Sequence, residues 1–343
     1  MTKYDEIGAA VWYNVKTNVM GEIMGPVEIV LAVFGFLLIS GGIGMLAYTL
    51  PIAKKVYETQ LVRTSEEKWG RVCSAPENEE QWQMWEAGIR WAEQNRDHLI
   101  EVEIENDGFH LYGEYYDFGA DRCVILLPGR CESLMYSYYF AEPYQKAGFN
   151  VLAIDTRCHG KSEGKYNTIG VKESRDVLGW ARLLHDRFLN KEVVFHGICI
   201  GTSAGLFAMI DKECPDYITG LVTEGCFVSF RETFKRHMLA EKRPLFPVLD
   251  LVMLLINKYT GTNVYKDKPI AAIKKLNKTA RVLFLYGEKD IFSIPPKTEQ
   301  LFAACSAEDK KLVWFSEGGH SHLRINNPEK YDNAIIEFFK QRV

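Results

Sequence analysis

Apolar and polar residues follow different patterns in successive parts of the chain. From Ile29 to Leu50 the sequence IVLAVFGFLLISGGIGMLAYTL contains no charged side chain. About 22 residues at 1.5 Å each are enough for an α-helix to cross a hydrocarbon core of roughly 30 Å. The pattern therefore predicts one transmembrane helix over residues 29–50, after a tail of residues 1–28. A buried core helix seldom runs so long without a charge, and a cleaved signal peptide would need basic residues before a shorter apolar run.

Basic residues near the ends of this span predict its orientation. Two precede it and five follow it closely: Lys3 and Lys16, then Lys54, Lys55, Arg63, Lys68 and Arg71. Because positive charge is enriched on the cytoplasmic side of a membrane, we expect a single-pass protein of the cell membrane whose C-terminal part faces the cytoplasm. The eight cysteines are scattered without C-x-x-C or zinc-ligand spacing, so we expect free thiols, which persist best in a reducing compartment.

Residues 51–98 form a polar connector that contains one amphipathic stretch. In ENEEQWQMWEAGIRWAEQN, the spacing of Trp82, Trp85, Ile89 and Trp91 predicts a helix with one apolar face. Packing of this face on the domain that follows is the favoured interpretation. A helix that lies on the membrane surface is the alternative, because indole rings favour that interface.

From residue 99 to residue 343, short apolar runs alternate with helical stretches. LIEVEIEND and FHLYGEYYD predict an opening hairpin, and six further runs end in turn signals: CVILLPG, NVLAID, EVVFHG, GLVTEG, RVLFLYG and KLVWFSEGG. Helical segments such as KESRDVLGWARLLHDRF lie between them. This alternation predicts an α/β domain with a mostly parallel sheet covered on both faces. Functional residues are expected at the carboxyl ends of its strands.

Composition and residue spacing argue against nucleic-acid binding and against a metal site. Hydrophobic residues make up 47% of the chain and charged residues 25%, which is typical of a folded protein. The net charge of -4 gives little electrostatic support for binding a nucleic-acid backbone. We therefore expect no nucleic-acid partner, and the spacing of cysteines and histidines predicts no metal site.

The motifs at the strand ends resemble those of the α/β-hydrolase superfamily over roughly residues 99–343. They are DTRCHGKSEG after the fourth strand, GICIG after the fifth, YGEKD after the seventh and GGH near the end. The nearest likeness is to the lidded serine hydrolases of the monoacylglycerol-lipase and serine-aminopeptidase type, whereas a cysteine within GICIG is similar to dienelactone hydrolase. The resemblance implies an eight-stranded sheet with helices on both faces, a helical lid and no organic cofactor.

The segment GICIGTSAG, residues 197–205, offers two nucleophiles, because the G-x-nucleophile-x-G spacing is centred once on Cys199 and once on Ser203. Such an elbow needs a strand directly before it and a helix directly after it. EVVFHG ends two residues before Cys199, and TSAGLFAMIDK supplies the helix. An elbow at Ser203 would force the strand through two glycines and shorten the helix to about two turns. Cys199 is therefore favoured, with Ser203 or no working nucleophile as alternatives.

The resemblance also implies a base and an acid. The base is expected after the last strand, where His320 lies in EGGHSHLRINNPEKY, with His322 as the alternative and two solvent-exposed loop histidines as the plainer interpretation. The acid is expected after the seventh strand, where Asp290 in YGEKDIFSIP is placed to hold the imidazole tautomer. Glu224, after the sixth strand, is the alternative acid. The chain order Cys199, Asp290, His320 is the order expected for this fold.

An oxyanion hole requires two backbone amides. Ile200, which follows the nucleophile, supplies one, and the loop LLPGRCES supplies the other from Arg130 or Cys131. The superfamily often has His-Gly where this chain has Pro128-Gly129, which puts the shape of the loop in doubt. The side chain of Arg130 is expected to be solvated, or alternatively to bind a substrate carboxylate.

Residues 227–278, between the sixth and seventh strands, are too many for a plain connection and are typical of a lid. RETFKRHMLAEKR within them is basic, and PLFPVLDLVMLLINKY is strongly apolar. A helical cap with its own packed face is the favoured interpretation. The alternative is a cap that meets the bilayer surface and admits lipid-like acyl substrates.

A cysteine at the elbow favours substrates with good leaving groups. A helix N-terminus and a neighbouring histidine favour the thiolate form of a thiol, which attacks activated esters, lactones and thioesters readily. The sequence therefore predicts a membrane-anchored hydrolase that cleaves small acyl esters or lipid-like substrates through an acyl-cysteine intermediate. Two other functions stay open: a catalytically silent binding module with the same fold, and an acyltransferase that uses the same intermediate.

Overall fold

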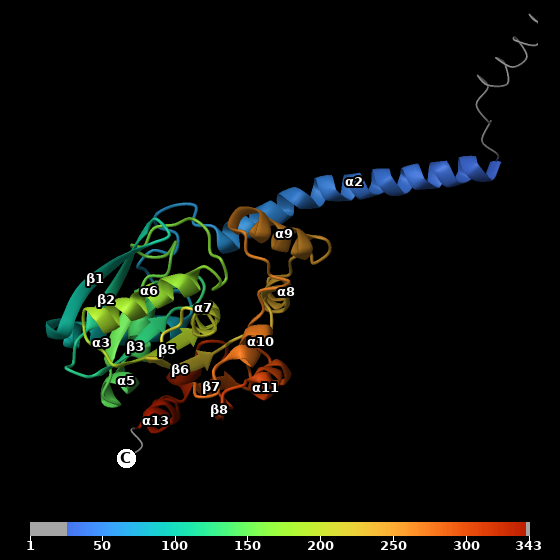
Figure 1. The fold of residues 1–343 in the computed structure, drawn as a ribbon. Coiled ribbons are helices and arrows are strands. Elements are labelled where there is room, and N and C mark those ends of the chain that lie inside the picture. The colour runs from blue at the N-terminus through green and yellow to red at the C-terminus, as the bar shows by residue number, and fades with distance from the viewer. Residues whose placement is uncertain (1–25, 341–343) are drawn as a thin grey trace, which may run out of the picture. The chain divides into compact units, whose positions relative to one another are not determined.

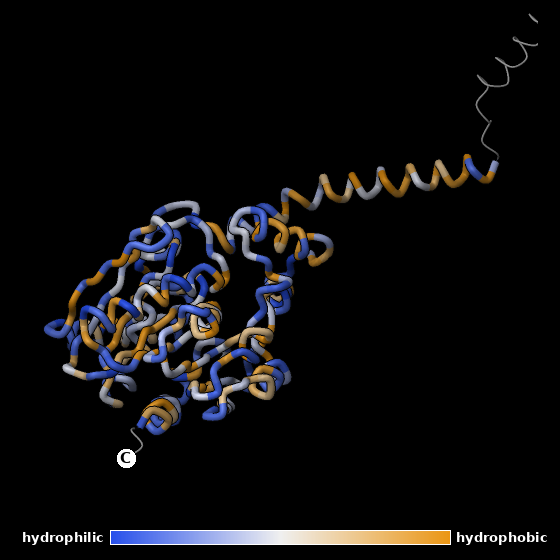
Figure 2. Tube along the Cα trace, viewed as in Figure 1, coloured by the Kyte–Doolittle hydropathy of each residue, from blue (hydrophilic) through white to orange (hydrophobic). Residues whose placement is uncertain are grey.

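The computed structural model describes residues 26–340, so most of the predicted tail lies outside the described residues. The chain divides into two compact units, Met1–Ile52 and Ala53–Val343. The helix α2 (Pro26–Leu61) begins in the first unit, and orange, hydrophobic residues recur along most of its length (Figure 2). It is long and apolar enough to cross a membrane, by length and composition. The helix continues past Pro51 instead of ending near Leu50, because residues of its last turns are buried in the second unit.

The second unit is built on one eight-stranded sheet in the order β1-β2-β4-β3-β5-β6-β7-β8 (Figure 1). β1 and β2 form the predicted antiparallel hairpin, β2 is antiparallel to β4, and all other neighbours are parallel. The mostly parallel α/β prediction is thus confirmed. The strands are β1 (Leu99–Asn106), β2 (Phe109–Tyr116), β3 (Arg122–Leu127), β4 (Asn150–Ile154), β5 (Glu192–Ile198), β6 (Ile218–Glu224), β7 (Arg281–Gly287) and β8 (Asp309–Phe315).

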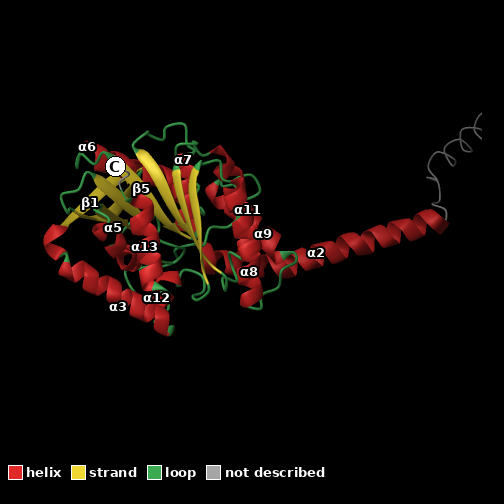
Figure 3. Ribbon diagram, turned by 90° about the horizontal axis from the view of Figure 1, so that it is seen from below, coloured by secondary structure: helices red, strands yellow, loops and turns green. Residues whose placement is uncertain are grey.

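Helices flank the strands on both faces of the sheet (Figure 3). Since side chains alternate along a strand, Val193 and Phe195 of β5 join one core, and the next residue, His196, meets Tyr144 and Tyr331 on the other face. The remaining helices are α3 (Glu79–Gln94), α4 (Leu134–Ser137), α5 (Glu142–Lys146), α6 (Glu173–Asp186), α7 (Ile200–Met209), α8 (Phe230–Ala240), α9 (Val248–Thr260), α10 (Pro269–Ala272), α11 (Pro295–Ala304), α12 (Leu323–Asn326) and α13 (Pro328–Phe339).

Two segments outside the sheet carry helices where the sequence predicts them. In the connector, α3 begins at Glu79 and is capped by Asn78, whose side chain accepts a hydrogen bond from the Gln81 amide at 3.1 Å. Trp85 and Trp91 are buried, and the indole of Trp91 donates to Gln145 at 2.9 Å. The insertion between β6 and β7 contains α8, α9 and α10.

Candidate active site

Cys199 occupies a sharp turn between β5 and α7. Its φ of 52° is a conformation that L-residues rarely adopt, and its side chain is 8% exposed. The Cys199 amide donates to the Glu224 carbonyl at 2.8 Å, which ties the turn to β6. The flanking glycines are needed for close packing: a Cβ at Gly201 would lie 2.1 Å from the Leu127 carbonyl oxygen, and one at Gly197 would lie 2.4 Å from Thr202.

Ser203, the alternative nucleophile, lies in the fourth position of α7 and is fully buried. Its Oγ has no hydrogen-bond partner among the described residues. A Cβ on Gly170 would lie only 2.6 Å from the Ser203 Cβ, so the serine fills the seam between α7 and the loop before α6. The turn that exposes a nucleophile is therefore centred on Cys199.

Asp290 and His320 are brought together from two loops that follow β7 and β8. His320 Nδ1 lies 2.8 Å from Asp290 Oδ2, and Asp290 Oδ1 accepts the amides of Phe292 and Ser293, each at 2.8 Å. Burial opposes ionisation of Asp290, but the His320 charge and these hydrogen bonds outweigh it and hold the pKa of Asp290 below its ordinary value.

The His320 ring carries a strongly perturbed pKa. Burial lowers it, but the charge and hydrogen bond of Asp290, followed by the Cys199 thiol, outweigh burial and raise the pKa of His320 well above 6.5. Its Nε2 is buried and meets hydrogen-bond geometry with no side chain of residues 26–340. Gly225 leaves room for the ring, because a Cβ there would lie 2.6 Å from His320 Cε1.

The insertion contributes a second imidazole that the sequence analysis missed. The His237 ring of α8 stacks on Phe292 at 3.8 Å between centroids and lies 6.5 Å from the His320 ring. Burial, followed by the positive charges of Arg130 and His320, lowers the pKa of His237 to about 3, so this ring is neutral near pH 7. A lone histidine in a basic stretch gave no signal, because only the folding of α8 over the sheet brings it to His320.

The alternative base and acid are engaged elsewhere. His322 Nε2 hydrogen-bonds to Gln81 Oε1 at 2.8 Å, so this ring is held by α3. Glu224 is fully buried and accepts a hydrogen bond from the Tyr331 hydroxyl at 2.5 Å. Burial raises the pKa of Glu224 to about 7, although the Tyr331 hydrogen bond and the His320 charge oppose this. The imidazole beside Cys199 is thus paired with Asp290.

Two backbone amides adjoin the thiol. Ile200 is the first residue of α7, so its amide has no acceptor within the helix. A Cβ at Gly129 would lie 3.8 Å from the Cys199 Cβ, which places the loop after β3 against the turn. In that loop the Arg130 amide donates to no acceptor in the described part of the chain, whereas Cys131 has a φ of 73°. The Ile200 amide therefore follows Cys199 directly in the chain, and the loop that contains Arg130 packs against the same turn.

The Arg130 side chain is partly buried and is bonded to the end of α2. Its Nη1 donates to the Gln60 carbonyl oxygen at 3.3 Å, to the Gln60 side-chain oxygen, and to the Cys131 sulfur at 3.5 Å. The end of α2 thus holds one nitrogen of the guanidinium, and binding of a substrate carboxylate by this side chain stays a prediction.

The loop after β4 is hydrogen-bonded to the start of α4. Asp155 is fully buried and accepts hydrogen bonds from the amides of Leu134 and Lys161 at 2.8 and 2.9 Å. Cys158 is also buried. Within residues 26–340, no group of three or more histidine, cysteine, aspartate or glutamate side chains is placed to hold a metal ion.

Comparisons with known proteins agree with this architecture. A model of the α/β hydrolase fold family matches residues 122–243. YqkD of Bacillus subtilis, itself uncharacterized, is 26% identical over 221 residues, which cover 63% of this chain and 70% of YqkD. Protein bem46 of Schizosaccharomyces pombe is 27% identical over 199 residues, which cover 58% of this chain and 60% of bem46.

A solved structure gives the same result. An esterase of Pyrococcus furiosus superposes with a TM-score of 0.61 and 22% identity, over 73% of this chain and 93% of the esterase. The order of the eight strands, the turn between β5 and α7, the family match and this superposition all point to one fold. The chain therefore has the α/β-hydrolase fold.

Proposed function

We propose that the protein is a membrane-anchored hydrolase that cleaves carboxylic ester, lactone or thioester bonds through an acyl-Cys199 intermediate. One observation carries the proposal: a thiol on a strained turn lies beside an imidazole whose Nδ1 is fixed by Asp290 and whose Nε2 is otherwise unpartnered. A nucleophile, a base and a group that orients the base are the three parts such catalysis needs. The fold shared with an esterase supports the hydrolytic class.

In the acylation step, His320 Nε2 takes the thiol proton and the Cys199 sulfur attacks the carbonyl carbon. The π-electron pair of the carbonyl moves to its oxygen, where the amides of Ile200 and Arg130 stabilise the negative charge. The C–S bond forms, the bond to the leaving group breaks, and the leaving oxygen or sulfur receives the proton from Nε2. Asp290 stays ionised throughout and keeps Nδ1 protonated.

In the deacylation step, a water molecule gives a proton to His320 Nε2 and its oxygen attacks the thioester carbon. The same two amides stabilise the second oxyanion, and the C–S bond then breaks to release a carboxylic acid. The Cys199 sulfur leaves as a thiolate and takes the proton back from His320 Nε2, which restores the resting thiol and imidazole. Acyl transfer to an alcohol or amine would follow the same path with a different attacking group.

The surroundings of the thiol support an uncharged substrate. The stacked rings of His237 and Phe292 form a neutral aromatic wall beside His320, contributed by the insertion and by the loop after β7. We propose that residues 227–278 act as a lid over the acyl group. Charged acyl chains would lose hydration against this wall without gaining a partner.

We propose further that α2 anchors the enzyme with its hydrolase unit on the cytoplasmic side. Its apolar stretch and the basic residues that follow it support this topology. Protease treatment of sealed vesicles of known orientation tests it. Digestion of the hydrolase unit from the cytoplasmic face only is the expected result, and digestion from the opposite face only would contradict the topology.

The proposed chemistry is tested with full-length protein in detergent. Wild type, Cys199→Ala and Ser203→Ala are compared for p-nitrophenyl butyrate hydrolysis and for alkylation by iodoacetamide with peptide mapping. We expect Cys199→Ala to lose both activities and Ser203→Ala to keep both, because Ser203 is buried away from the turn. Wild type without turnover would indicate a silent binding module, and transfer products that exceed free acid in the presence of alcohols or amines would indicate an acyltransferase.

A further inference from the structure

The last turns of α2 belong to the hydrolase unit. The helix runs from Ala53 to Leu61 within this unit, and the residues of one face are buried: Ala53, Val56, Tyr57 and Leu61. The ring of Tyr57 stacks on Tyr259 in the last turn of α9, with centroids 5.5 Å apart and planes inclined by 14°. Residues 53–61 are therefore packed into the catalytic unit like any of its own helices.

Side chains of the hydrolase unit cap the end of this helix. The last carbonyl groups of a helix lack partners within it and carry partial negative charge. The Lys68 ammonium donates to the carbonyls of Glu58 and Val62 at 2.7 and 2.5 Å, and the Arg130 guanidinium donates to the Gln60 carbonyl at 3.3 Å. Two cations thus hold the C-terminal end of α2.

One of these cations is part of the loop that we call the oxyanion loop, residues 129–133. The side-chain oxygen of Gln60 accepts a second hydrogen bond from Arg130, the residue whose amide we assign to the oxyanion under the proposed function. Cys131, the next residue, is in the left-handed region with a φ of 73°. A residue in that region is held there by its surroundings and not by its own preference.

The connector holds the other end of the oxyanion loop. Glu132 Oε1 accepts hydrogen bonds from the Ser74 hydroxyl at 2.5 Å and from the Gln81 side-chain amide at 3.0 Å. Ser74 lies in the connector and Gln81 in α3, which are both N-terminal to the sheet. The loop is therefore bound before Cys131 by the end of α2 and after Cys131 by the segment that joins α2 to the first strand.

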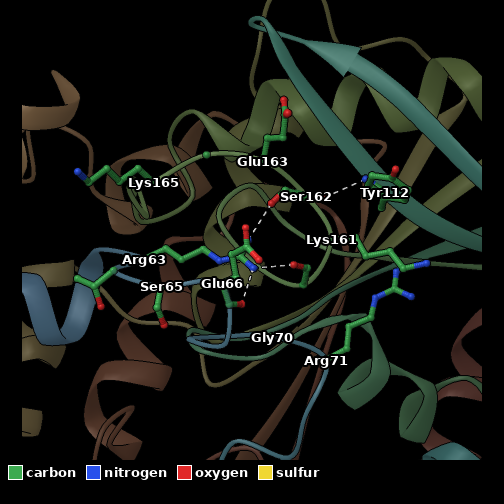
Figure 4. A pocket seen from close by; sticks show the side chains of 13 residues that line it. Arg63, Ser65, Glu66, Gly70, Arg71, Tyr112, Lys161, Ser162, Glu163 and Lys165 are labelled. Atoms are coloured by element: carbon green, nitrogen blue, oxygen red, sulfur yellow. Dashed lines mark hydrogen bonds between the residues drawn. The ribbon is translucent and has the colours of Figure 1, made fainter.

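The connector is in turn joined to the loop after β4, across a hollow of about 830 Å³ (Figure 4). Arg63 donates to the carbonyls of Gly160 and Ser162 at 2.8 and 3.1 Å, and Arg71 donates to Asp155 at 2.9 Å. These two arginines are used in internal hydrogen bonds, so the hollow is a braced seam and not an anion site.

We propose that Gln60 is a positioning residue for the oxyanion loop, and that the end of the membrane helix is thereby part of the catalytic apparatus. This inference rests on the proposed function, because it assigns the Arg130 amide to the oxyanion. Without the Gln60 side chain, Arg130 keeps only the bond to the Gln60 carbonyl and the 3.5 Å contact with the Cys131 sulfur, and the strained Cys131 is free to relax. The Arg130 amide then moves relative to the reacting oxygen, and a shift of about 1 Å costs up to roughly 10²-fold in rate.

The test compares Gln60→Ala, Gln60→Glu and the adjacent control Thr59→Ala in full-length protein. Thr59 is exposed, and its hydroxyl bonds only to the Lys55 carbonyl of its own helix. We expect Gln60→Ala to lower kcat about 10- to 100-fold with KM within about twofold of wild type. Gln60→Glu keeps an acceptor for Arg130 and should restore most of kcat. Iodoacetamide alkylation of Cys199 forms no oxyanion, so its rate should be unchanged in all three variants.

Two outcomes would overturn the proposal. One is wild-type kcat in Gln60→Ala, and the other is a parallel loss of alkylation and turnover, which would indicate general structural damage. If Gln60→Ala does not fold, Ser74→Ala applies the same test from the exposed connector, with a several-fold loss of kcat expected and an unchanged kcat contradicting the idea. Failure of the proposed function itself is distinct, because wild type would then show neither turnover nor alkylation of Cys199.

Discussion

Replacement of Asp290 by asparagine tests the pairing on which the proposed base depends. In wild type, one oxygen of Asp290 accepts hydrogen bonds from two backbone amides, and the other accepts a hydrogen bond from His320 Nδ1 at 2.8 Å. The side-chain oxygen of asparagine can keep the two amides, but its NH₂ group then faces Nδ1. The imidazole must expose an unprotonated Nδ1 to this donor, which leaves Nε2 protonated and unable to accept the thiol proton.

The magnitude follows from this change of tautomer and from the loss of charge. Asp290 is 5% exposed, so no water replaces the lost interaction easily. We expect kcat/KM for p-nitrophenyl butyrate to fall roughly 10²- to 10⁴-fold, about 3–5 kcal/mol of transition-state stabilisation. The pKa of His320 should also fall toward its ordinary value, because the Asp290 charge and hydrogen bond are the main groups that raise it against burial.

The assay includes Glu224→Gln as the matched control. Glutamine can still accept the hydrogen bond from Tyr331, and it resembles the neutral form that the raised pKa of Glu224 favours. Its kcat/KM should stay within about threefold of wild type. The reasoning is refuted if Asp290→Asn keeps full activity, or if Glu224→Gln is the variant that loses it.

Three further predictions concern Gly225, His237 and His159. Gly225→Ala would place a Cβ 2.6 Å from the ring of His320, and should lower kcat at least 10-fold in the same ester assay, with an unchanged kcat counting against the ring position. His237→Ala removes the ring stacked on Phe292 and should raise KM for butyrate esters several-fold more than it lowers kcat; a pure kcat effect would contradict a substrate-wall role. Burial lowers the pKa of His159 to about 4, so the unfolded chain binds more protons between pH 6.5 and 4 and this residue's contribution is lost as pH falls through that window. Within this window, His159 should lower the free energy of unfolding by about 1.4 kcal/mol for each pH unit of acidification. Urea unfolding of His159→Gln between pH 7 and 5 should show a pH dependence of the free energy of unfolding that lacks this part.

Local signals made the fold and the centre of the site predictable. The turn at Cys199 could be predicted from neighbouring residues, because an apolar strand, two glycines and a helix occur within one short stretch. Asp290 was predicted from the resemblance to α/β-hydrolases, which implies an acid after the seventh strand, and the carboxyl ends of parallel strands meet at one edge of the sheet. His320 and His322 are two residues apart in one loop, and only the fold separates them, by binding His322 to α3.

Contacts between distant segments could not be predicted in this way. The bond between Gln60 and Arg130 joins residues 70 positions apart, and neither residue carries a signal for the other. His237 reaches His320 only through the path of the insertion. The sequence analysis ended the predicted transmembrane helix at Leu50, with the stretch that lacks charged residues, whereas packing of later residues extends α2 to Leu61.

The most direct test of the central claim is to trap the acyl group on the enzyme. Full-length protein is mixed with p-nitrophenyl butyrate, quenched in acid within the burst phase, and digested with trypsin. The peptide of residues 192–212 contains both Cys199 and Ser203, so fragment ions must locate the added butyryl group between them. The account predicts a hydroxylamine-labile butyryl thioester on Cys199 that is absent from Cys199→Ala, whereas a butyryl ester on Ser203, or turnover with no acyl group on this peptide, would contradict it.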